Sequence, residues 1–232
     1  MLLDVEWETI NPGRILLGTN NRTILFGGIG PRHEVKIDYQ FEICKYPLKK
    51  EICKRLLLEG CNIASESEWS LALKQNKIFG NNEIEELSDE INNSYWGKIC
   101  DGSPFMSNDW IFRVGREWKL GKNEIIQISK ENNEVEYYRL VRNKQKIGSK
   151  KQINVLPSAS DKIRIFSEEL LICMLIGIIP SFIWAYFNAS SNYIYEGWLN
   201  LIFGGLFFGF FTIIFWRPRT KTWMIEDGLD TK

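Results

Sequence analysis

The longest apolar segments of the chain lie near its C-terminus, at Leu170–Phe187 and Trp198–Trp216. Neither contains a charged side chain, and as a helix rising about 1.5 Å per residue each spans roughly the 27–29 Å of a bilayer core. Because a backbone in lipid must satisfy its own hydrogen bonds, two such segments predict a hairpin of transmembrane helices. Pro180 is expected to kink the first helix.

Small residues recur at every fourth position on one face of each predicted helix. They are Gly177, Ser181 and Ala185 in the first helix, and Gly205 and Gly209 in the second. Because small residues let helix backbones approach closely in lipid, these faces are predicted to pack together. Neither span holds an ionisable residue suited to transport or proton relay, so the hairpin is predicted to be an anchor.

Basic residues flank the hairpin on both outer sides, whereas its linker, residues 188–197, carries only the charge of Glu196. The positive-inside rule therefore predicts an integral membrane protein with both termini cytoplasmic and the linker outside. A cation close to anionic lipid contributes about 1 kcal/mol to membrane binding. The residues expected to contact lipid headgroups are Lys144, Lys146, Lys150, Lys151, Arg217 and Arg219.

Shorter patterns precede the hairpin. Residues 35–41 alternate apolar and polar side chains, as a half-buried strand does. Apolar positions at helical spacing predict a helix over Leu48–Glu59, ended by Gly60. Ser65 and Glu68 have the spacing of a capping box, which places a second helix start at Ser65.

Two short apolar runs near the N-terminus, Arg14–Gly18 and Thr23–Phe26, flank the turn signal Asn20-Asn21. The glycine-rich run at residues 27–31 superficially resembles a phosphate-binding loop. However, no Lys followed by Ser or Thr comes after it, so a plain turn is predicted.

Composition narrows the class of protein. The formal net charge is zero, which gives no indication of a nucleic-acid partner. The five cysteines are odd in number and form no C-x-x-C pair, which suits a reducing compartment. They also lack metal-site spacing, so we expect them to be small buried hydrophobic residues. The short acidic N-terminus shows no signal peptide, in agreement with a cytoplasmic domain.

Residues 62–72 (NIASESEWSLA) resemble the Arg-Leu-Pro-Thr-Glu-Ala-Glu-Trp-Glu-Tyr-Ala segment of the formylglycine-generating enzyme family, also called sulfatase-modifying factor domains. Weaker similarities to the family's motifs follow its order, at residues 17–18, 31–35, 41–48, 113–118 and 138–142. Over residues 14–143 the resemblance implies an irregular α+β fold related to C-type lectins, with long loops and a small twisted antiparallel sheet.

The chain departs from the family's catalytic members. Those that are oxidases hold copper through a late pair of cysteines, and no cysteine lies between Arg113 and Arg142. The related sulfoxide synthases hold iron through three histidines, and this chain has only His33. We therefore predict no cofactor and no metal, and a domain that is a pseudoenzyme.

Residues 94–104 concentrate aromatic, thiol, carboxylate and turn-forming groups, as binding loops often do. Together with two later segments they predict a shallow cleft lined by Tyr95, Trp96, Cys100, Asp101, Trp110, Arg116 and Trp118. The competing interpretation is an ordered turn whose aromatic rings fill the core. A reactive Cys100 would need a pKa lowered by cations such as Lys98.

The predicted organisation is an enzyme-like domain at 1–143, a basic linker at 144–164, helices at 165–187 and 198–216, an external loop at 188–197 and a tail at 217–232. Three functions fit it. The first is a membrane-anchored, non-catalytic domain that recognises a protein or small ligand at the cytoplasmic membrane face. The second is a divergent oxidoreductase that uses Cys100, and the third is a structural subunit of a membrane complex. The missing metal ligands favour the first.

Overall fold

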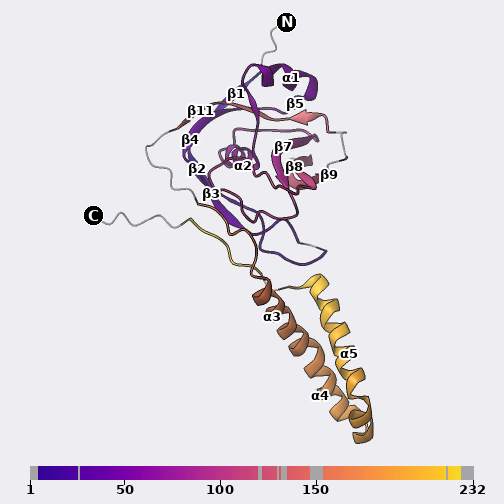
Figure 1. The fold of residues 1–232 in the computed structure, drawn as a ribbon. Helices are drawn as coiled ribbons and strands as arrows, with labels where there is room; N and C mark the ends of the chain where they lie inside the picture. Colours follow the sequence, from indigo (N-terminus) through magenta and orange to yellow (C-terminus); the bar gives the residue numbers. More distant parts are fainter. Residues whose placement is uncertain are drawn as a thin grey trace, which may run out of the picture. The chain divides into compact units, whose positions relative to one another are not determined.

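The computed structural model describes residues 5–25, 27–119, 122–129, 131, 135–146, 154–217 and 219–225. Its contacts divide the chain into two compact units. The first comprises Met1–Gly18, Arg32–Ser158 and Thr222–Lys232, and the second comprises Thr19–Pro31 and Ala159–Lys221. The first holds the strands and two short helices, and the second holds the two long apolar helices (Figure 1).

Three sheets build the first unit. The four-stranded sheet has the order β1 (Trp7–Ile10), β4 (Tyr39–Cys44), β11 (Leu140–Lys146), β6 (Asn62–Ile63). The five-stranded sheet has the order β5 (Leu48–Lys49), β10 (Tyr137–Tyr138), β7 (Ile84–Ile91), β8 (Phe112–Lys119), β9 (Lys122–Ser129). The third sheet pairs β2 (Gly13–Leu17) with β3 (His33–Ile37). The fold is therefore α+β, and β10 with β7 is the parallel pair among these strands.

Two helices pack among the sheets, α1 (Lys50–Leu58) and α2 (Glu66–Lys74). The capping box is confirmed, since Ser65 Oγ accepts from the Glu68 amide at 3.1 Å and Glu68 Oε2 accepts from the Ser65 amide at 3.0 Å. The helix predicted from Leu48 begins two residues later because Leu48–Lys49 pairs with β10. Gly60, with a φ of 91°, follows the end of α1 as predicted.

The N-terminal strand predictions are partly wrong. The alternation at 35–41 is divided at Asp38 between β3 and β4, which belong to different sheets. Of the two apolar runs around Asn20-Asn21, the first lies largely in β2, which pairs with β3. The described part of the second run, Thr23–Leu25, forms no strand and belongs to the other unit.

The first unit also includes residues that were predicted to be linker and tail. Strand β11 continues to Lys146, and Val155 forms an antiparallel bridge with Ile99. Near the C-terminus, Trp223 forms a parallel bridge with His33. Such segments pair with extended backbone because its unpaired N–H and C=O groups need hydrogen-bond partners. The predicted domain therefore ends too early at 143, and the tail predicted from 217 includes residues of the first unit. Lys150 and Lys151 lie outside the described residues.

The second unit contains a helical hairpin. Its first arm, Lys162–Asn188, comprises α3 (Lys162–Ile172), η1 (Cys173–Ile178) and α4 (Ile179–Asn188). Its second arm is α5 (Ser191–Phe215). Both arms, of 27 and 25 residues, are long and apolar enough to cross a membrane, and only 22% of the most apolar stretch of each is buried. A core helix of a soluble protein would be mostly buried.

The turn of the hairpin is shorter than predicted. Ser190 caps α5 by accepting from the Tyr193 amide at 3.3 Å, so most of the predicted loop 188–197 is helical. The cap satisfies an amide that a longer loop would leave to water. On the first arm, the wide π-turn η1 ends at Ile178, close to Pro180, a residue that cannot donate a helical hydrogen bond.

The two arms contact through their small residues. A Cβ atom on Gly205 would lie 2.6 Å from the Ile178 Cα atom, and one on Gly209 would lie 2.8 Å from the Cys173 Cα atom. A Cβ atom on Gly177 would lie 2.8 Å from the Gly205 carbonyl carbon. These glycines therefore let the backbones meet.

Two further small residues complete this face. Ser181 Oγ donates across the hairpin to the Leu201 carbonyl at 2.9 Å and within its own helix to the Ile178 carbonyl at 2.7 Å. Ala185 is fully buried. The arms are thus held together by close backbone contact and by one hydrogen bond between them, as apolar helices in lipid are.

Candidate functional site

The centre of the first unit holds a buried ion pair between Glu85 of β7 and Arg139. Arg139 donates from Nε and Nη2 to the two Glu85 oxygens at 2.7 Å, and neither side chain is exposed. Arg139 Nη1 also donates to the Cys44 carbonyl at 2.7 Å, while the indoles of Trp69 and Trp118 donate to Glu85. This pair joins the four-stranded and five-stranded sheets, and its hydrogen-bonding groups are occupied.

A second buried carboxylate, Glu66, lies in the first turn of α2. Arg116 Nη2 donates to Glu66 Oε1 at 3.1 Å and to Ser70 Oγ at 3.0 Å, and the Tyr95 hydroxyl donates to Glu66 Oε2. Burial raises the pKa of Glu66, although the Arg116 charge opposes the shift. Burial and the Glu66 charge raise the pKa of Tyr95 in turn. Arg116 and Tyr95 therefore donate hydrogen bonds to a carboxylate in the interior of the fold.

Asp89 of β7 fixes the loop that was predicted to bind. Lys98 Nζ donates to Asp89 Oδ1 at 2.7 Å, with both side chains fully buried. The Phe105 amide donates to the same oxygen at 2.9 Å, and the Glu66 amide donates to Oδ2 at 2.6 Å. The loop over residues 94–104 is therefore held against the start of α2 by one carboxylate.

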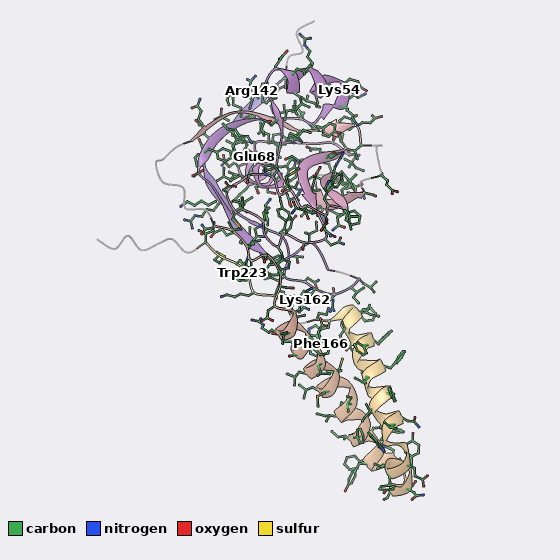
Figure 2. The ribbon with its side chains drawn as sticks, viewed as in Figure 1. Lys54, Glu68, Arg142, Lys162, Phe166 and Trp223 are labelled. Carbon is green, nitrogen blue, oxygen red and sulfur yellow. The ribbon has the colours of Figure 1, made fainter. Side chains whose placement is uncertain are left out.

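Glu68 lies in the interior of the first unit, where Figure 2 labels it. Its Oε1 accepts from the Tyr39 hydroxyl at 2.6 Å and pairs with Lys144 Nζ at 2.6 Å. Lys144, expected at the lipid headgroups, is thus engaged inside this unit because β11 carries it over α2. The side chain of Lys146 lies outside the described residues.

The structure distributes the seven predicted cleft residues between the core and the surface. Tyr95, Arg116 and Trp118 are buried around α2, where their polar atoms bond Glu66 and Glu85. The competing interpretation, aromatic rings filling the core, describes Tyr95 and Trp118. Each of these three residues is at most 7% exposed.

Cys100 is also buried. Burial raises the pKa of its thiol to about 11, with the Lys98 charge only partly opposing this. The thiol is therefore protonated at neutral pH, and Cys100 lacks the lowered pKa that a reactive cysteine needs.

The other three predicted cleft residues retain partial exposure. Trp96 contacts Trp223 edge to face, with 6.2 Å between ring centroids. Asp101 accepts from the Ser103 amide at 3.0 Å, in a local turn. Trp110 lies under the Arg113 guanidinium, 5.1 Å from its ring centroid. Each of these three residues thus contacts a different neighbour.

A surface depression lies elsewhere in the first unit, beside α2, β2 and β3. It has a volume of about 400 Å³ and is lined by Arg14, Ile15, Leu16, Glu34, Ser70, Lys74 and Met224. None of these residues was predicted to be a site residue. The available signals were weak, namely the spacing of Ser70 and Lys74 on one helix face and of Arg14 and Leu16 on one strand face.

Two cations and one carboxylate border this depression. Arg14 Nη1 lies 3.9 Å from Glu34 Oε1, and Lys74 Nζ donates to the Arg14 carbonyl at 2.8 Å. The Ile225 amide donates to the other oxygen of Glu34 at 3.0 Å. From beneath, Arg116 donates to Ser70 Oγ. Positive charge beside the apolar side chains of Leu16 and Met224 suits an anionic ligand with an apolar part.

Within the described residues, no group of three or more His, Cys, Asp or Glu side chains is placed to hold a metal ion. The five cysteines are free and buried. In the second unit, Arg217 pairs with Glu169 at 2.8 Å, and Arg219 is exposed.

No protein-family profile and no curated protein matches this sequence. One solved structure is similar, that of PvdO from Pseudomonas aeruginosa, with 12% sequence identity and a TM-score of 0.45. The similarity covers 60% of this chain and 94% of PvdO. This likeness is too distant to assign a family, so the formylglycine-generating-enzyme resemblance stays a prediction.

Proposed function

We propose that the chain is a membrane-anchored, non-catalytic recognition protein. Its first unit, with a formylglycine-generating-enzyme-like fold, would bind a ligand at the cytoplasmic membrane face, and its hairpin would span the bilayer. The observation that carries this proposal is the inverted distribution of side chains in the hairpin. Glycines lie between the arms, whereas Phe203, Phe207 and Phe210 are 65%, 76% and 62% exposed. Such a surface is stable in lipid and unfavourable in water.

The non-catalytic part of the proposal follows from how the polar groups of the first unit are used. Glu66, Glu85 and Asp89 are buried and saturated by cations and amides. A general base needs access to a substrate proton, and a nucleophilic cysteine needs a low pKa. Neither condition is met by these carboxylates or by Cys100.

The surface depression is the proposed recognition site. Arg14 and Lys74 can donate to a carboxylate or phosphate, and the side chains of Leu16 and Met224 can cover an apolar group. The ligand class is therefore a small molecule or peptide end that combines one anionic group with one aliphatic group.

Membrane insertion is tested by expressing the full chain in bacteria and extracting membranes with alkaline carbonate. We expect the protein to stay in the pellet. Topology is read from an epitope inserted at the turn Ala189–Ser190 and another at the C-terminus, with protease added to intact spheroplasts. Digestion of the turn epitope alone is expected. Release by carbonate, or digestion of the C-terminal epitope alone, would refute the proposed anchoring or its orientation.

Recognition is tested by titrating the full chain in detergent with N-acetylleucine and with inorganic phosphate, using isothermal calorimetry. Removing a charged hydrogen bond costs about 1.5–3 kcal/mol, so Arg14→Gln should weaken binding by roughly tenfold or more. Arg55→Gln is the matched control, since Arg55 lies on α1 with a side chain 67% exposed. Binding of neither probe, or equal binding by both variants, would remove the depression as the site.

A second function, that of a structural subunit in a membrane complex, is favoured by the exposed phenylalanines of α5. The glycine faces are occupied within the hairpin, so they offer a partner no surface. A partner would therefore have to pack against aromatic rings. Blue-native electrophoresis of a variant with both Phe203→Ala and Phe207→Ala tests this function. If the variant forms a smaller complex than the wild type does, the result would support a structural subunit.

A further inference from the structure

The segment Thr19–Pro31 belongs to the hairpin unit although it comes from the N-terminal part of the chain. Its backbone closes into a loop, with the Thr19 amide donating to the Ile29 carbonyl at 2.8 Å. The Leu25 amide faces the Ile214 carbonyl in the last turn of α5 at 3.5 Å, and the Thr220 amide donates to the Asn20 carbonyl at 3.3 Å. The loop is thus attached to the end of the hairpin that carries both chain connections.

Ion pairs hold the same loop to the first arm. Arg22 Nη2 lies 2.7 Å from Glu169 Oε1, and Arg217 Nη2 lies 2.8 Å from the same oxygen. Arg217 Nη1 also donates to the Arg22 carbonyl at 3.2 Å. One carboxylate at the start of the first apolar segment therefore joins the loop, the first arm and the end of the second arm.

The loop presents aliphatic side chains at this level. Ile24 is 64% exposed and Leu25 is 59% exposed. At the same end of the hairpin, Phe166 of α3 and Trp216 after α5 are 66% and 55% exposed; Figure 2 labels Phe166 on α3. The exposed apolar surface of the loop therefore joins the apolar surface of the hairpin itself.

We propose that this loop is a third membrane contact, in which Ile24 and Leu25 insert into the interfacial region of the leaflet where the hairpin ends. The proposal rests on the proposed membrane-spanning hairpin. If α5 crosses the bilayer, Ile214 and Trp216 lie near its boundary, and the loop bonded to Ile214 lies at the same depth. Aliphatic side chains gain free energy there by leaving water.

The charges next to the loop fit this depth. Arg22, Glu169 and Arg217 together carry one net positive charge, and long arginine side chains can reach the headgroups while their stems stay in the apolar layer. A positive cluster at this level is attracted to anionic lipid. The loop would therefore fix the hairpin's end at the membrane surface through apolar insertion beside a basic cluster.

The test uses the full chain reconstituted in vesicles of phosphatidylcholine and phosphatidylglycerol. An environment-sensitive nitrobenzoxadiazole fluorophore is attached to Ile24→Cys, since the five native cysteines are buried and should not be labelled in the folded protein. Leu58→Cys, on α1 and 89% exposed, is the aqueous control, and Phe208→Cys, 55% exposed on α5, is the lipid control. Unlabelled wild type treated in the same way measures background labelling.

We expect the label at position 24 to show blue-shifted emission, to be quenched by lipids with a spin label near the headgroup, and to resist iodide. Label 58 should show the opposite, and label 208 should be quenched by spin labels deep in the acyl chains. If label 208 is in lipid while label 24 behaves like label 58, the loop inference is wrong and the hairpin proposal stands. If label 208 is also accessible to iodide, the proposed hairpin insertion itself fails.

Discussion

The two units bury different kinds of groups in their interiors. The first unit buries charges, of which Glu85, Arg139, Asp89 and Lys98 are examples. The second unit buries glycine backbone between its arms and leaves phenylalanine side chains on the outside. This difference shows how the expected solvent of each unit determines which groups its core can contain.

In the first unit, burying a charge is tolerable because a partner and several hydrogen bonds compensate the lost hydration. Within the proposed lipid environment, large apolar side chains gain little by contacting each other, so close backbone packing provides the stabilisation instead.

Removing one partner of the central ion pair should have the largest effect. Arg139→Met leaves Glu85 buried without its cation and should lower the free energy of unfolding by about 3–5 kcal/mol. The measurement is urea unfolding of the full chain in mild detergent, followed by tryptophan fluorescence. Arg142→Met, nearby in β11, is the matched control, because Arg142 is 39% exposed and its pair with Glu42 should contribute less than about 1 kcal/mol.

A second substitution makes this prediction sharper. Glu85→Leu combined with Arg139→Met removes both charges, so the double variant should recover part of the stability that Arg139→Met loses. A cost for Arg139→Met no greater than that for Arg142→Met would contradict the importance assigned to the buried pair.

The hairpin should be sensitive to the position of a side chain rather than to its charge. Gly205→Leu places atoms against Ile178 and should cost about 1–3 kcal/mol of helix–helix stability. A Cβ atom on Gly204, one residue earlier, would meet nothing within 4 Å, so Gly204→Leu should be nearly neutral. Titration with sodium dodecyl sulfate, followed by fluorescence transfer between labels on the two arms, separates these outcomes. Equal effects of the two variants would argue against packing at this glycine.

Helix capping should matter more in the first unit than in the hairpin. Ser65→Ala removes the cap of α2 and the hydrogen bond from Ser65 Oγ to the Gly102 carbonyl, 2.7 Å long and buried, so a loss of about 1–2 kcal/mol is expected. Ser190→Ala should cost less than about 1 kcal/mol because water can replace an exposed cap. The same denaturation experiments compare the two, and a larger effect at Ser190 would reverse this part of the comparison.

Alkaline pH should weaken the first unit through its buried thiols. Burial raises the pKa of Cys44 from 9.0 to about 12. Above pH 9 the unfolded chain therefore loses a proton that the folded chain keeps, so stability falls as the pH rises towards the folded pKa. At about pH 9.5 the expected loss is below about 1 kcal/mol for one thiol. Between pH 8 and about pH 9.5, the free energy of unfolding measured with urea should decline less steeply for Cys44→Ala than for the wild type. An equal decline in the two proteins would contradict the raised pKa of Cys44.

Much of the local structure could be predicted from neighbouring residues. The capping box at Ser65 and the end of α1 at Gly60 depend on spacings within a few residues, and both are found. The lengths of the apolar segments likewise predict two long helices, which are found. Residues 188–197 were predicted to be a loop because they form a polar linker. Most of them are helical instead, because Ser190 caps α5.

The candidate site could not be predicted in the same way. Its lining combines β2, β3, α2 and Met224, which are brought together by pairing between segments distant in sequence. The aromatic and charged residues after Ser94 have a composition that is typical of binding loops. Several of them, namely Tyr95, Lys98, Arg116 and Trp118, instead donate to buried carboxylates, and composition alone does not show which carboxylate a side chain will reach.

The sequence by itself determined the two long apolar helices and the start of α2, because each depends on periodicity or spacing over a few turns. Only the tertiary structure decided that Arg139 pairs with Glu85, that residues 154–157 and 222–225 join the first unit, and that Thr19–Pro31 joins the hairpin. Those outcomes depend on which distant backbone edge or charge is available once the chain is compact, and no local pattern carries that information.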